Sequence, residues 1–431
     1  SKTRLLPMHI DGPVLLYGAG REARSTAAFL RRAYPEIELF VTTDDGVAEL
    51  EGASFITPEE ANQVSRFGTI VKSPGVSLYK PIFEMARAAG VTVTSNLNIW
   101  GAHFREGRTV VAISGTKGKS TTATLVHLML EKSGVDVVLA GNVGIPPLDA
   151  ADSAQTVVLE LSSYQTADID FAPDIAAISN LYPEHVDWHG GLDAYYRDKL
   201  NLIAKGPKFV AIGPQAATVE RVISTIPAAT QRIPALDIEL ADEILMAAMN
   251  SRLKGAHNHD NARLAAAIAL AAGATREGIF KGIEAFVPLP HRLEELMVGD
   301  ILFVDDSIST TPEATKVALA AYKGKKIALI AGGHERQQDY TDLANLMGLT
   351  SVVMLCSLPV TGQRLAQAVR DNTPIPIAEC STLDEAMQAL ASAGHVFDTV
   401  ILSPGAPSYN QFKNFEERGD RFKTLARQHF S

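Results

Sequence analysis

The sequence contains very little cysteine: only Cys356 and Cys380 occur among 431 residues. The two lack metal-ligand spacing, and so few cysteines suit a reducing compartment. The sequence also lacks an apolar run of the roughly 20 residues that a membrane-spanning helix needs. Its N-terminal stretch has no signal-peptide pattern. We therefore expect a cytoplasmic protein that does not enter a membrane.

Positive charge is also in deficit. Lysine and arginine total 39 against 49 acidic residues, which gives a formal net charge of −10. This balance disfavours a nucleic-acid-binding protein. The hydrophobic content of 46% and charged content of 20% are ordinary for a globular protein. A chain of this length exceeds one hydrophobic core, so we expect two or three domains.

The most informative stretch is 109–134, TVVAISGTKGKSTTATLVHLMLEKSG. An apolar strand leads through a glycine loop into a helix, and a helix N-terminus is a ready site for phosphate. The strict phosphate-loop motif has a glycine where this chain has Ile113. The competing interpretation is a tight turn with solvated lysines. The strand before the loop and the helix after it favour phosphate binding by Gly115, Thr116, Lys117, Gly118, Lys119, Ser120 and Thr121.

The N-terminal stretch 13–45 has the pattern of a dinucleotide-binding βαβ unit. An apolar run ends in Gly18-Ala19-Gly20, and Thr43 follows the second strand. Ser73-Pro74-Gly75 ends a later strand, where open α/β sheets bind ligands. The pattern alone leaves three alternatives: a nicotinamide or flavin cofactor, another nucleotide diphosphate such as a UDP-sugar, or a turn without a ligand. This domain should end near Trp100.

Acidic and imidazole groups follow the strands of the next unit. Glu160 interrupts the apolar run TVVLELSSYQ, and a buried carboxylate must be paired, hydrogen-bonded or bound to a metal. It is a candidate Mg²⁺ ligand, or it caps a neighbouring element. The strand 175–179 leads to a polar loop with Asn180, Glu184, His185, Asp187 and His189. His185 is the better ligand, whereas His189 reads as a packed or solvated side chain. Lys199, by itself, reads as a solvated helix lysine.

The last third of the chain repeats the pattern of strands that end in polar loops. An alanine-rich helix begins with Asn258 and Asn261, which could read a base or ribose or cap the helix. The proline-flanked pair His291-Arg292 reads as a stiff linker into a third domain. There Asp305 and Asp306 end one strand, and Arg336 follows another. We expect a site along one edge of a parallel sheet.

Several strings together resemble the Mur ligase family of cell-wall precursor enzymes. They are SGTKGKST, GNVG, LELSSYQ, NLYPEHVDWHG with YYRDK, GAHNHDN, PLPHRLE, DDSISTTP and SPGAPSYNQFKNFEERG. These strings lie between residues 114 and 419, and the closing string most resembles the glutamate-adding members. The combination is specific, although no single string is.

The resemblance implies an α/β protein of three domains. They are a Rossmann-like UDP-binding domain at 1–102, a central P-loop-type ATPase domain at 103–288, and a Rossmann-like glutamate-binding domain at 289–431. The implied activity is an ATP-dependent amide ligase that joins glutamate to UDP-N-acetylmuramoyl-L-alanine through an acyl phosphate, in peptidoglycan synthesis. This favours UDP over nicotinamide in the first domain. We expect a monomer without nucleic-acid or membrane partners.

The resemblance also assigns the residues. Lys119 would hold the β- and γ-phosphates, and Ser120, Glu160 and His185 would bind Mg²⁺. Lys199 would be carbamylated and serve a second Mg²⁺, which overturns its reading as a solvated lysine. The other nucleotide contacts would be Asn258, Asn261, Arg292 and Asp306. The UDP substrate would meet Ala19, Gly20, Thr43, Ser73, Pro74, Gly75, Asn142, Ser162 and His185. The glutamate carboxylates would meet Thr310, Arg336, Ser408 and Phe415.

The handedness of the glutamate stays open at this point. Ile308 and Arg336 stand where the glutamate-adding members commonly have lysines, and a guanidinium does not replace an ammonium without consequence. The family default is D-glutamate, but a rarer branch adds L-glutamate, and DSISTTP and GREAR fit that branch about as well. Two other functions compete with this ligase: a folylpolyglutamate-synthase-type ligase, and a non-catalytic nucleotide sensor on the same fold.

Overall fold

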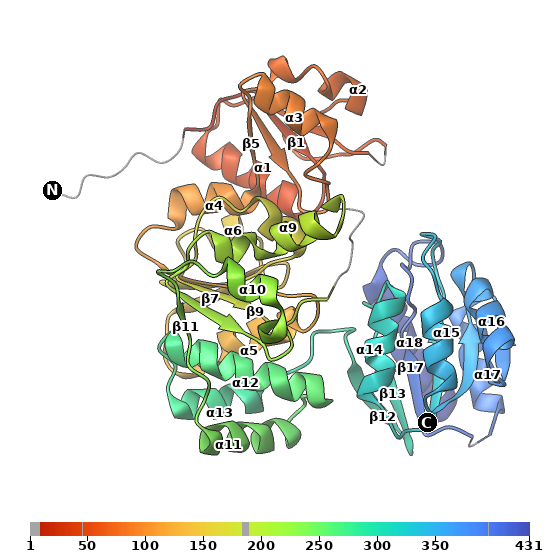
Figure 1. Ribbon diagram of the computed structural model, residues 1–431. Coiled ribbons are helices and arrows are strands. Elements are labelled where there is room, and N and C mark those ends of the chain that lie inside the picture. Colours follow the sequence, from red (N-terminus) through yellow and green to blue (C-terminus); the bar gives the residue numbers. More distant parts are fainter. Residues whose placement is uncertain (1–8, 45, 183–188, 395) are drawn as a thin grey trace. The chain divides into compact units, whose positions relative to one another are not determined.

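The computed structural model describes residues 9–44, 46–182, 189–394 and 396–431. Three sheets follow one another along the chain, and helices flank each of them (Figure 1). Residues up to Phe286, apart from 254–256, form one compact unit, and the remaining residues form a second. The α/β class expected from the sequence is confirmed. No helix in the described ranges is both long and apolar enough to cross a membrane.

The first sheet has the strand order β3-β2-β1-β4-β5 and is parallel throughout. This is the order of a dinucleotide-binding fold, and it reverses direction between β1 and β4. Its strands are β1 Val14–Tyr17, β2 Leu39–Thr42, β3 Ser54–Phe55, β4 Thr69–Lys72 and β5 Thr92–Thr94. Its helices are α1 Arg21–Ala33, α2 Pro58–Ala61, η1 Val64–Arg66, α3 Pro81–Ala88 and α4 Asn96–Phe104.

The second sheet is also parallel, in the order β11-β10-β9-β6-β8-β7. The central strand β6 therefore ends between the ends of β8 and β9. The strands are β6 Thr109–Ser114, β7 Val137–Gly141, β8 Thr156–Glu160, β9 Ile175–Ile178, β10 Phe209–Ile212 and β11 Gln231–Arg232. The helices are α5 Lys119–Lys132, α6 Pro147–Ala150, α7 Ser163–Asp168, α9 Leu192–Ala204, η2 Ala216–Thr218, α10 Glu220–Thr225, α11 Ile238–Met249, α12 Ala256–Ala271 and α13 Arg276–Ala285.

The first two sheets share a hydrophobic core. Trp100 of α4 is fully buried in one cluster with Leu16 of β1 and Ala112 of β6, and its indole N–H donates to Ala151 O over 3.0 Å. The sequence placed the end of a domain near Trp100. The structure shows a continuous apolar core across that point, which explains why both sheets belong to one compact unit.

The third sheet has the order β12-β13-β17-β14-β15-β16. Its edge strand β12 is antiparallel to β13, and the other pairs are parallel. The strands are β12 Glu294–Val298, β13 Ile301–Asp305, β14 Ile327–Ala331, β15 Val352–Ser357, β16 Ile377–Glu379 and β17 Thr399–Leu402. The helices are α14 Pro312–Ala321, α15 Thr341–Gly348, α16 Thr361–Asn372, α17 Leu383–Ser392 and α18 Phe415–Phe430.

Both faces of this third sheet are buried. Phe303 and Leu402 belong to one apolar cluster, whereas their neighbours Val304 and Ile401 belong to another. Successive side chains of a strand point to opposite faces, so helices must cover both sides. This explains the nearly continuous apolar runs that predict these strands, and it leaves polar groups only at the strand ends.

Candidate functional site

The glycines of the phosphate loop lie where a side chain does not fit. Gly115 has a φ of +146°, and a Cβ on it would lie 2.0 Å from Ser179 Oγ. Gly118 has a φ of +72°, and a Cβ there would lie 2.5 Å from Asn261 Nδ2. Helix α5 begins at the next residue, Lys119. The loop is therefore folded tightly between β9 and the start of α12, with a helix N-terminus behind it.

Asn180 holds this loop in place. Its Oδ1 accepts the backbone N–H groups of Thr116 and Lys117 over 3.1 and 2.9 Å. Its Nδ2 donates to Lys117 O over 2.9 Å, and Ser179 Oγ donates to the same oxygen over 2.8 Å. The sequence pointed to Asn180 only as one polar group among several. Its position directly after β9, the neighbour of β6, is the signal that explains this role.

Ser120 and Glu160 meet behind the loop. Ser120 Oγ donates to Glu160 Oε1 over 3.4 Å, and both side chains are buried. Glu160 ends β8, which lies beside β6, so the parallel register brings the carboxylate to the start of α5. A hydroxyl and a carboxylate are the oxygen ligands that Mg²⁺ prefers. The oxygen atoms of Ser120 and Glu160 are therefore of the type expected to bind Mg²⁺.

Lys199 reaches the phosphate loop from α9. Its Nζ donates to Gly115 O over 2.9 Å, and only 4% of the residue is exposed. Nζ also lies 6.0 Å from the centre of the Tyr195 ring. The reading of Lys199 as a solvated helix lysine is therefore wrong, because the ammonium lies inside the candidate site.

The start of α12 forms another side of this site. Asn261 is buried and donates from Nδ2 to Asn258 Oδ1 over 3.2 Å. Burial lowers the pKa of the neighbouring His257, and the charges of His259 and Lys117 lower it further. Thus the amide pair expected near adenine lies beside Gly118. His185, Glu184 and Asp187 lie outside the described residues, so the expected His185 ligand has no structural account here.

The first sheet brings its two candidate loops together at its reversal point. A Cβ on Gly18 would lie 2.3 Å from Ser73 Oγ, so Ala19 and Gly20 lie near the Ser73-Pro74-Gly75 turn. Gly20 is the N-cap of α1. The first backbone N–H groups of that helix, which have no partner within the helix, therefore face the two loops. Thr43 follows β2, and its hydroxyl donates to Gly46 O over 2.9 Å. The two loops expected at the UDP substrate therefore lie together at the edge where open α/β sheets bind ligands.

Arg21 connects this edge to the central sheet. Its guanidinium donates to Gly141 O, Asn142 O and Gly144 O over 2.8, 3.3 and 3.0 Å. The GNVG loop, with Asn142, is therefore fastened beside the start of α1. The sequence marked Arg21 only as part of the string GREAR and gave no sign of this contact, because the contact depends on how two distant loops pack.

Ser162 is fixed by a second connection between the two sheets. It is the N-cap of α7 and forms a capping box with Gln165. Gln165 Nε2 donates to Glu22 Oε1 over 3.1 Å. Burial raises the pKa of Glu22 to about 7, while the cations Arg21 and Lys72 oppose the shift and Asp168 adds to it. The residues expected at the UDP-substrate end, Asn142 and Ser162, are thus both tied to α1.

In the second unit, three polar loops follow β13, β14 and β17 at the carboxyl edge of the sheet. Gln338 Nε2 donates to Thr310 O over 2.9 Å, so the loops after β13 and β14 touch. Gly405 N donates to Ser309 O over 3.1 Å, which joins the loops after β13 and β17. Ser408 is buried in the loop after β17, whereas Arg336 is exposed after β14. Phe415 begins α18, and its carbonyl accepts from Ser307 Oγ over 2.7 Å.

Arg292 and Asp306, the other two expected nucleotide contacts, lie in this second unit. Asp306 is buried, and its carboxylate accepts three hydrogen bonds. The donors are Ser309 Oγ, Ser403 Oγ and Leu293 N, at 2.5, 2.7 and 3.1 Å. Burial raises its pKa to about 6, although these hydrogen bonds and the charge of Arg292 act in the opposite direction. In this structure Asp306 therefore fixes the loop that carries Arg292.

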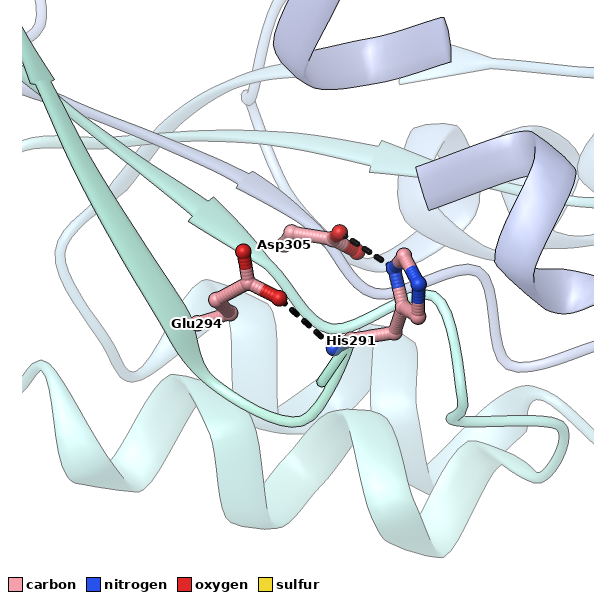
Figure 2. A group of neighbouring side chains, drawn as sticks. All are labelled: His291, Glu294 and Asp305. Atoms are coloured by element: carbon pink, nitrogen blue, oxygen red, sulfur yellow. Dashed lines mark hydrogen bonds and ion pairs between the residues drawn. The ribbon is translucent and has the colours of Figure 1, made fainter. Parts of the chain in front are cut away.

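His291, Glu294 and Asp305 form an acidic cluster in the second unit (Figure 2). His291 Nδ1 lies 2.6 Å from Asp305 Oδ2, and the backbone N–H of His291 donates to Glu294 Oε1 over 3.0 Å. The donor types could hold a metal. However, Lys423 Nζ lies 2.6 Å from Glu294 Oε2 and 3.8 Å from Asp305 Oδ2, and thus supplies the positive charge. We assign this cluster a structural role.

The position of Gly419 supports that role. A Cβ on Gly419 would lie 2.1 Å from His291 Nδ1 and 2.5 Å from Asp305 Oδ2. Helix α18 therefore passes directly over the pair, which fastens the His291-Arg292 segment to the sheet. The sequence predicted a linker here, and the strand β12 that begins at Glu294 was missed. An antiparallel edge strand next to two prolines gives little local signal.

Comparison with known proteins agrees with this arrangement. Residues 113–270 match the family model of the Mur ligase middle domain. The chain is 34% identical over 443 residues to the UDP-N-acetylmuramoyl-L-alanine–L-glutamate ligase of Micromonospora sp., covering 96% of each chain. It is 33% identical over 443 residues to the ligase of the same name from Xanthomonas oryzae, covering 96% of this chain and 94% of the relative.

Solved structures share the fold at lower identity. UDP-N-acetylmuramate–alanine ligase MurC from Thermotoga maritima aligns with a TM-score of 0.60 and 17% identity, over 96% of this chain and 99% of that one. MurF from Acinetobacter baumannii aligns with a TM-score of 0.58 and 18% identity, over 85% of this chain and 92% of that one. The three successive sheets are therefore an architecture that these ligases have in common.

Proposed function

This chain belongs to the Mur ligase family of ATP-dependent ligases, and from that premise we propose that it joins L-glutamate to UDP-N-acetylmuramoyl-L-alanine. The observation that carries the proposal is the convergence of Lys199, Ser120 and Glu160 on the phosphate loop. Relatives that cover 96% of the chain and carry that activity in their names support the choice of substrates.

The reaction needs a carboxylate to accept a phosphoryl group. A carboxylate does not react with an amine directly, so the alanyl carboxylate would attack the γ-phosphorus of ATP and release ADP. Both reactants are negative, and stabilisation of the charge by positioned cations lowers the barrier. Lys119 would hold the β- and γ-phosphates at the start of α5. The glutamate amine would then attack the acyl phosphate, form the amide bond and release inorganic phosphate.

Mg²⁺ fits the donors at this site. Ser120 and Glu160 would hold one ion, and Lys199, if carbamylated, would offer an anionic oxygen to a second. The ions would supply positive charge next to the phosphate oxygens. His185 remains the proposed further ligand. Asn258 and Asn261 would contact the adenine, and Arg292 and Asp306 remain predicted nucleotide contacts.

The UDP substrate would bind at the reversal point of the first sheet. Ala19, Gly20 and the Ser73-Pro74-Gly75 turn would meet the uridine diphosphate, with Thr43 at the end of β2. Asn142 and Ser162 would meet the muramoyl-alanine end, because Arg21 and Gln165 tie their loops to α1. A folylpolyglutamate-synthase-type ligase gives no reason for this first sheet, whereas a UDP-linked substrate does.

The L configuration is supported by the relatives' names. Thr310, Ser408 and Phe415 would surround the amino acid, and Arg336 would clamp a carboxylate with its two-pronged guanidinium. A lysine at that position would offer a point charge instead. The guanidinium geometry therefore fixes the carboxylate orientation more narrowly, which favours one enantiomer.

Phosphate release tests the ligase activity. We expect ADP and phosphate to form only when ATP, Mg²⁺, UDP-N-acetylmuramoyl-L-alanine and glutamate are all present, with one amide formed for each ATP consumed. Turnover of ATP that persists after the UDP substrate is omitted, or that continues undiminished without glutamate, contradicts the proposal. Replacement of the UDP substrate by a reduced folate tests the alternative ligase, and we expect no turnover with it.

A further inference from the structure

Two side chains from separate parts of the chain meet on one carboxylate beside Lys199. Tyr79 Oη donates to Asp198 Oδ2 over 2.6 Å, and His189 Nδ1 lies 2.7 Å from the same oxygen. Because a carboxylate only accepts, we assign the proton to His189 Nδ1. Asp198 and His189 are 3% and 1% exposed. A buried carboxylate in this setting is held by two short, charge-assisted hydrogen bonds.

These contacts fix the orientation of Asp198. Arg197 completes the group: its guanidinium donates to Tyr79 Oη over 3.2 Å and lies 3.9 Å from Asp198 Oδ1. Burial raises the pKa of Tyr79, and its hydrogen bond to Asp198 raises it further. The Tyr79 hydroxyl therefore stays protonated and remains a donor to the carboxylate.

Tyr79 lies in the loop after β4, which begins with Ser73-Pro74-Gly75 and is called the substrate loop below. It follows Ser73-Pro74-Gly75 by four residues, and its backbone N–H donates to Ser77 Oγ over 3.2 Å. The ring projects far enough to be 45% exposed, yet the hydroxyl reaches α9 of the central region. The loop that would carry the uridine diphosphate is thus joined directly to α9.

The neighbour of Asp198 on α9 is Lys199. Successive residues of an α-helix point about 100° apart, so a helix that presents Asp198 to Tyr79 presents Lys199 to the phosphate loop. Rotation of α9 about its axis would move both side chains together. The Asp198 contacts therefore hold the rotation at which Lys199 Nζ donates to Gly115 O.

We propose that Tyr79 and Asp198 are positioning residues, which align the substrate loop of the first sheet with α9 and thereby hold Lys199 on the phosphate loop. The inference rests on the proposed function in one respect: it takes the Ser73–Gly75 loop to carry the UDP substrate. Their effect on the nucleotide runs through Lys199 and Gly115.

The test uses Tyr79→Phe, Asp198→Asn and the double variant in the full chain. The first removes one oxygen atom, and the second keeps the size of the side chain and removes its charge. Binding of the ATP analogue AMP-PNP is measured by calorimetry, and kcat is measured with the proposed substrates. The control is Asp193→Asn, which removes a carboxylate from the same helix where it is 92% exposed and pairs with Arg221.

We expect each single variant to weaken AMP-PNP binding about fivefold or more and to lower kcat similarly, since each removes or weakens a charge-assisted hydrogen bond. The double variant should be no worse than the worse single variant, because the Tyr79–Asp198 hydrogen bond that Tyr79→Phe removes is already weakened in Asp198→Asn. Asp193→Asn should match the parent protein.

The inference is wrong if the folded variants bind AMP-PNP as tightly as the parent does. It is also wrong if the losses of affinity in the two single variants multiply in the double variant. A purely structural role would lower the melting temperature but leave AMP-PNP affinity and kcat of the folded protein unchanged. AMP-PNP binding does not depend on which amino acid is added. If the glutamate ligase assignment is wrong, the parent protein will not turn over the proposed substrates. The comparison of AMP-PNP binding between parent and variants would still test the positioning role of Tyr79 and Asp198.

Discussion

Lys199 Nζ donates a hydrogen bond to the backbone oxygen of Gly115 over 2.9 Å, across 84 positions of sequence. A buried ammonium is costly unless it is paired, so its place against the phosphate loop indicates a function rather than a packing accident. The contact joins α9 to the loop that would bind triphosphate. The adjacent residue of α9, Asp198, is bonded to Tyr79 of the first sheet's region.

The first prediction concerns this lysine. Lys199→Ala should abolish nearly all turnover, by about 10²–10³-fold or more, because it removes a charged group from the reacting phosphates. If Lys199 is carbamylated, formate or acetate should restore part of the activity by replacing the anionic oxygen. Lys205→Ala, on an exposed residue just after the same helix, is the control. A variant whose turnover stays intact would instead support a non-catalytic nucleotide sensor.

The second prediction concerns Asn180. Asn180→Ala leaves the N–H groups of Thr116 and Lys117 and the carbonyl of Lys117 without this partner. An unmet buried hydrogen bond costs about 1–3 kcal/mol. We expect a lower melting temperature and a KM for ATP at least about tenfold higher, with little change in KM for glutamate. Asn250→Ala, at the exposed end of α11, should change neither quantity. An unchanged KM for ATP would show that Asn180 does not shape the loop.

The third prediction concerns the cation. Glu160→Gln keeps the size of the side chain and removes the charge that would bind Mg²⁺. The Mg²⁺ concentration for half-maximal turnover should rise at least about tenfold, while binding of the UDP substrate stays the same. Glu131→Gln, on an exposed face of α5, is the matched control. A Mg²⁺ dependence equal to that of the parent would remove Glu160 from the proposed ligand set.

The fourth prediction concerns stability and pH. The pKa of Glu22 is raised from 4.5 to about 7, so the folded state binds this proton more tightly than the unfolded state. Its contribution to stability is present at low pH and is lost as the pH rises from about 4.5 through 7. Glu22→Gln cannot lose that proton, and its Oε1 can still accept from Gln165.

Relative to the parent, Glu22→Gln should gain free energy of unfolding between pH 5 and pH 8, by at most about 3 kcal/mol. Urea unfolding at the two pH values measures the difference. A stability gap that stays constant with pH, or that narrows as the pH rises, would contradict the raised pKa of Glu22.

The sequence predicted those features that one local segment determines. The phosphate loop appears as strand, glycines and helix in succession, and Glu160 stands out as an acidic residue in an apolar strand. The fold class and the positions of most central strands followed from similar runs. The resemblance to a family then proposed roles for residues such as Lys199, which composition alone assigned to solvent.

Other features depend on which segments become neighbours in space, and the sequence did not reveal them. Asn180 acts on the loop because β9 pairs with β6, and Trp100 joins two cores because α4 lies against both sheets. The contact of Tyr79 with Asp198 spans 119 positions. The strand β12 is short, antiparallel and next to prolines, so its own residues give little indication of it.

The most direct test of the proposed activity is turnover with each glutamate enantiomer. Purified protein receives ATP, Mg²⁺, UDP-N-acetylmuramoyl-L-alanine and either L- or D-glutamate, and the amide product is measured together with phosphate release. We predict efficient turnover with L-glutamate and a kcat/KM at least about tenfold lower with D-glutamate, since a misplaced carboxylate leaves a charged hydrogen bond unmade. Preference for D-glutamate would contradict the proposed specificity, and no product with either enantiomer would contradict the ligase itself.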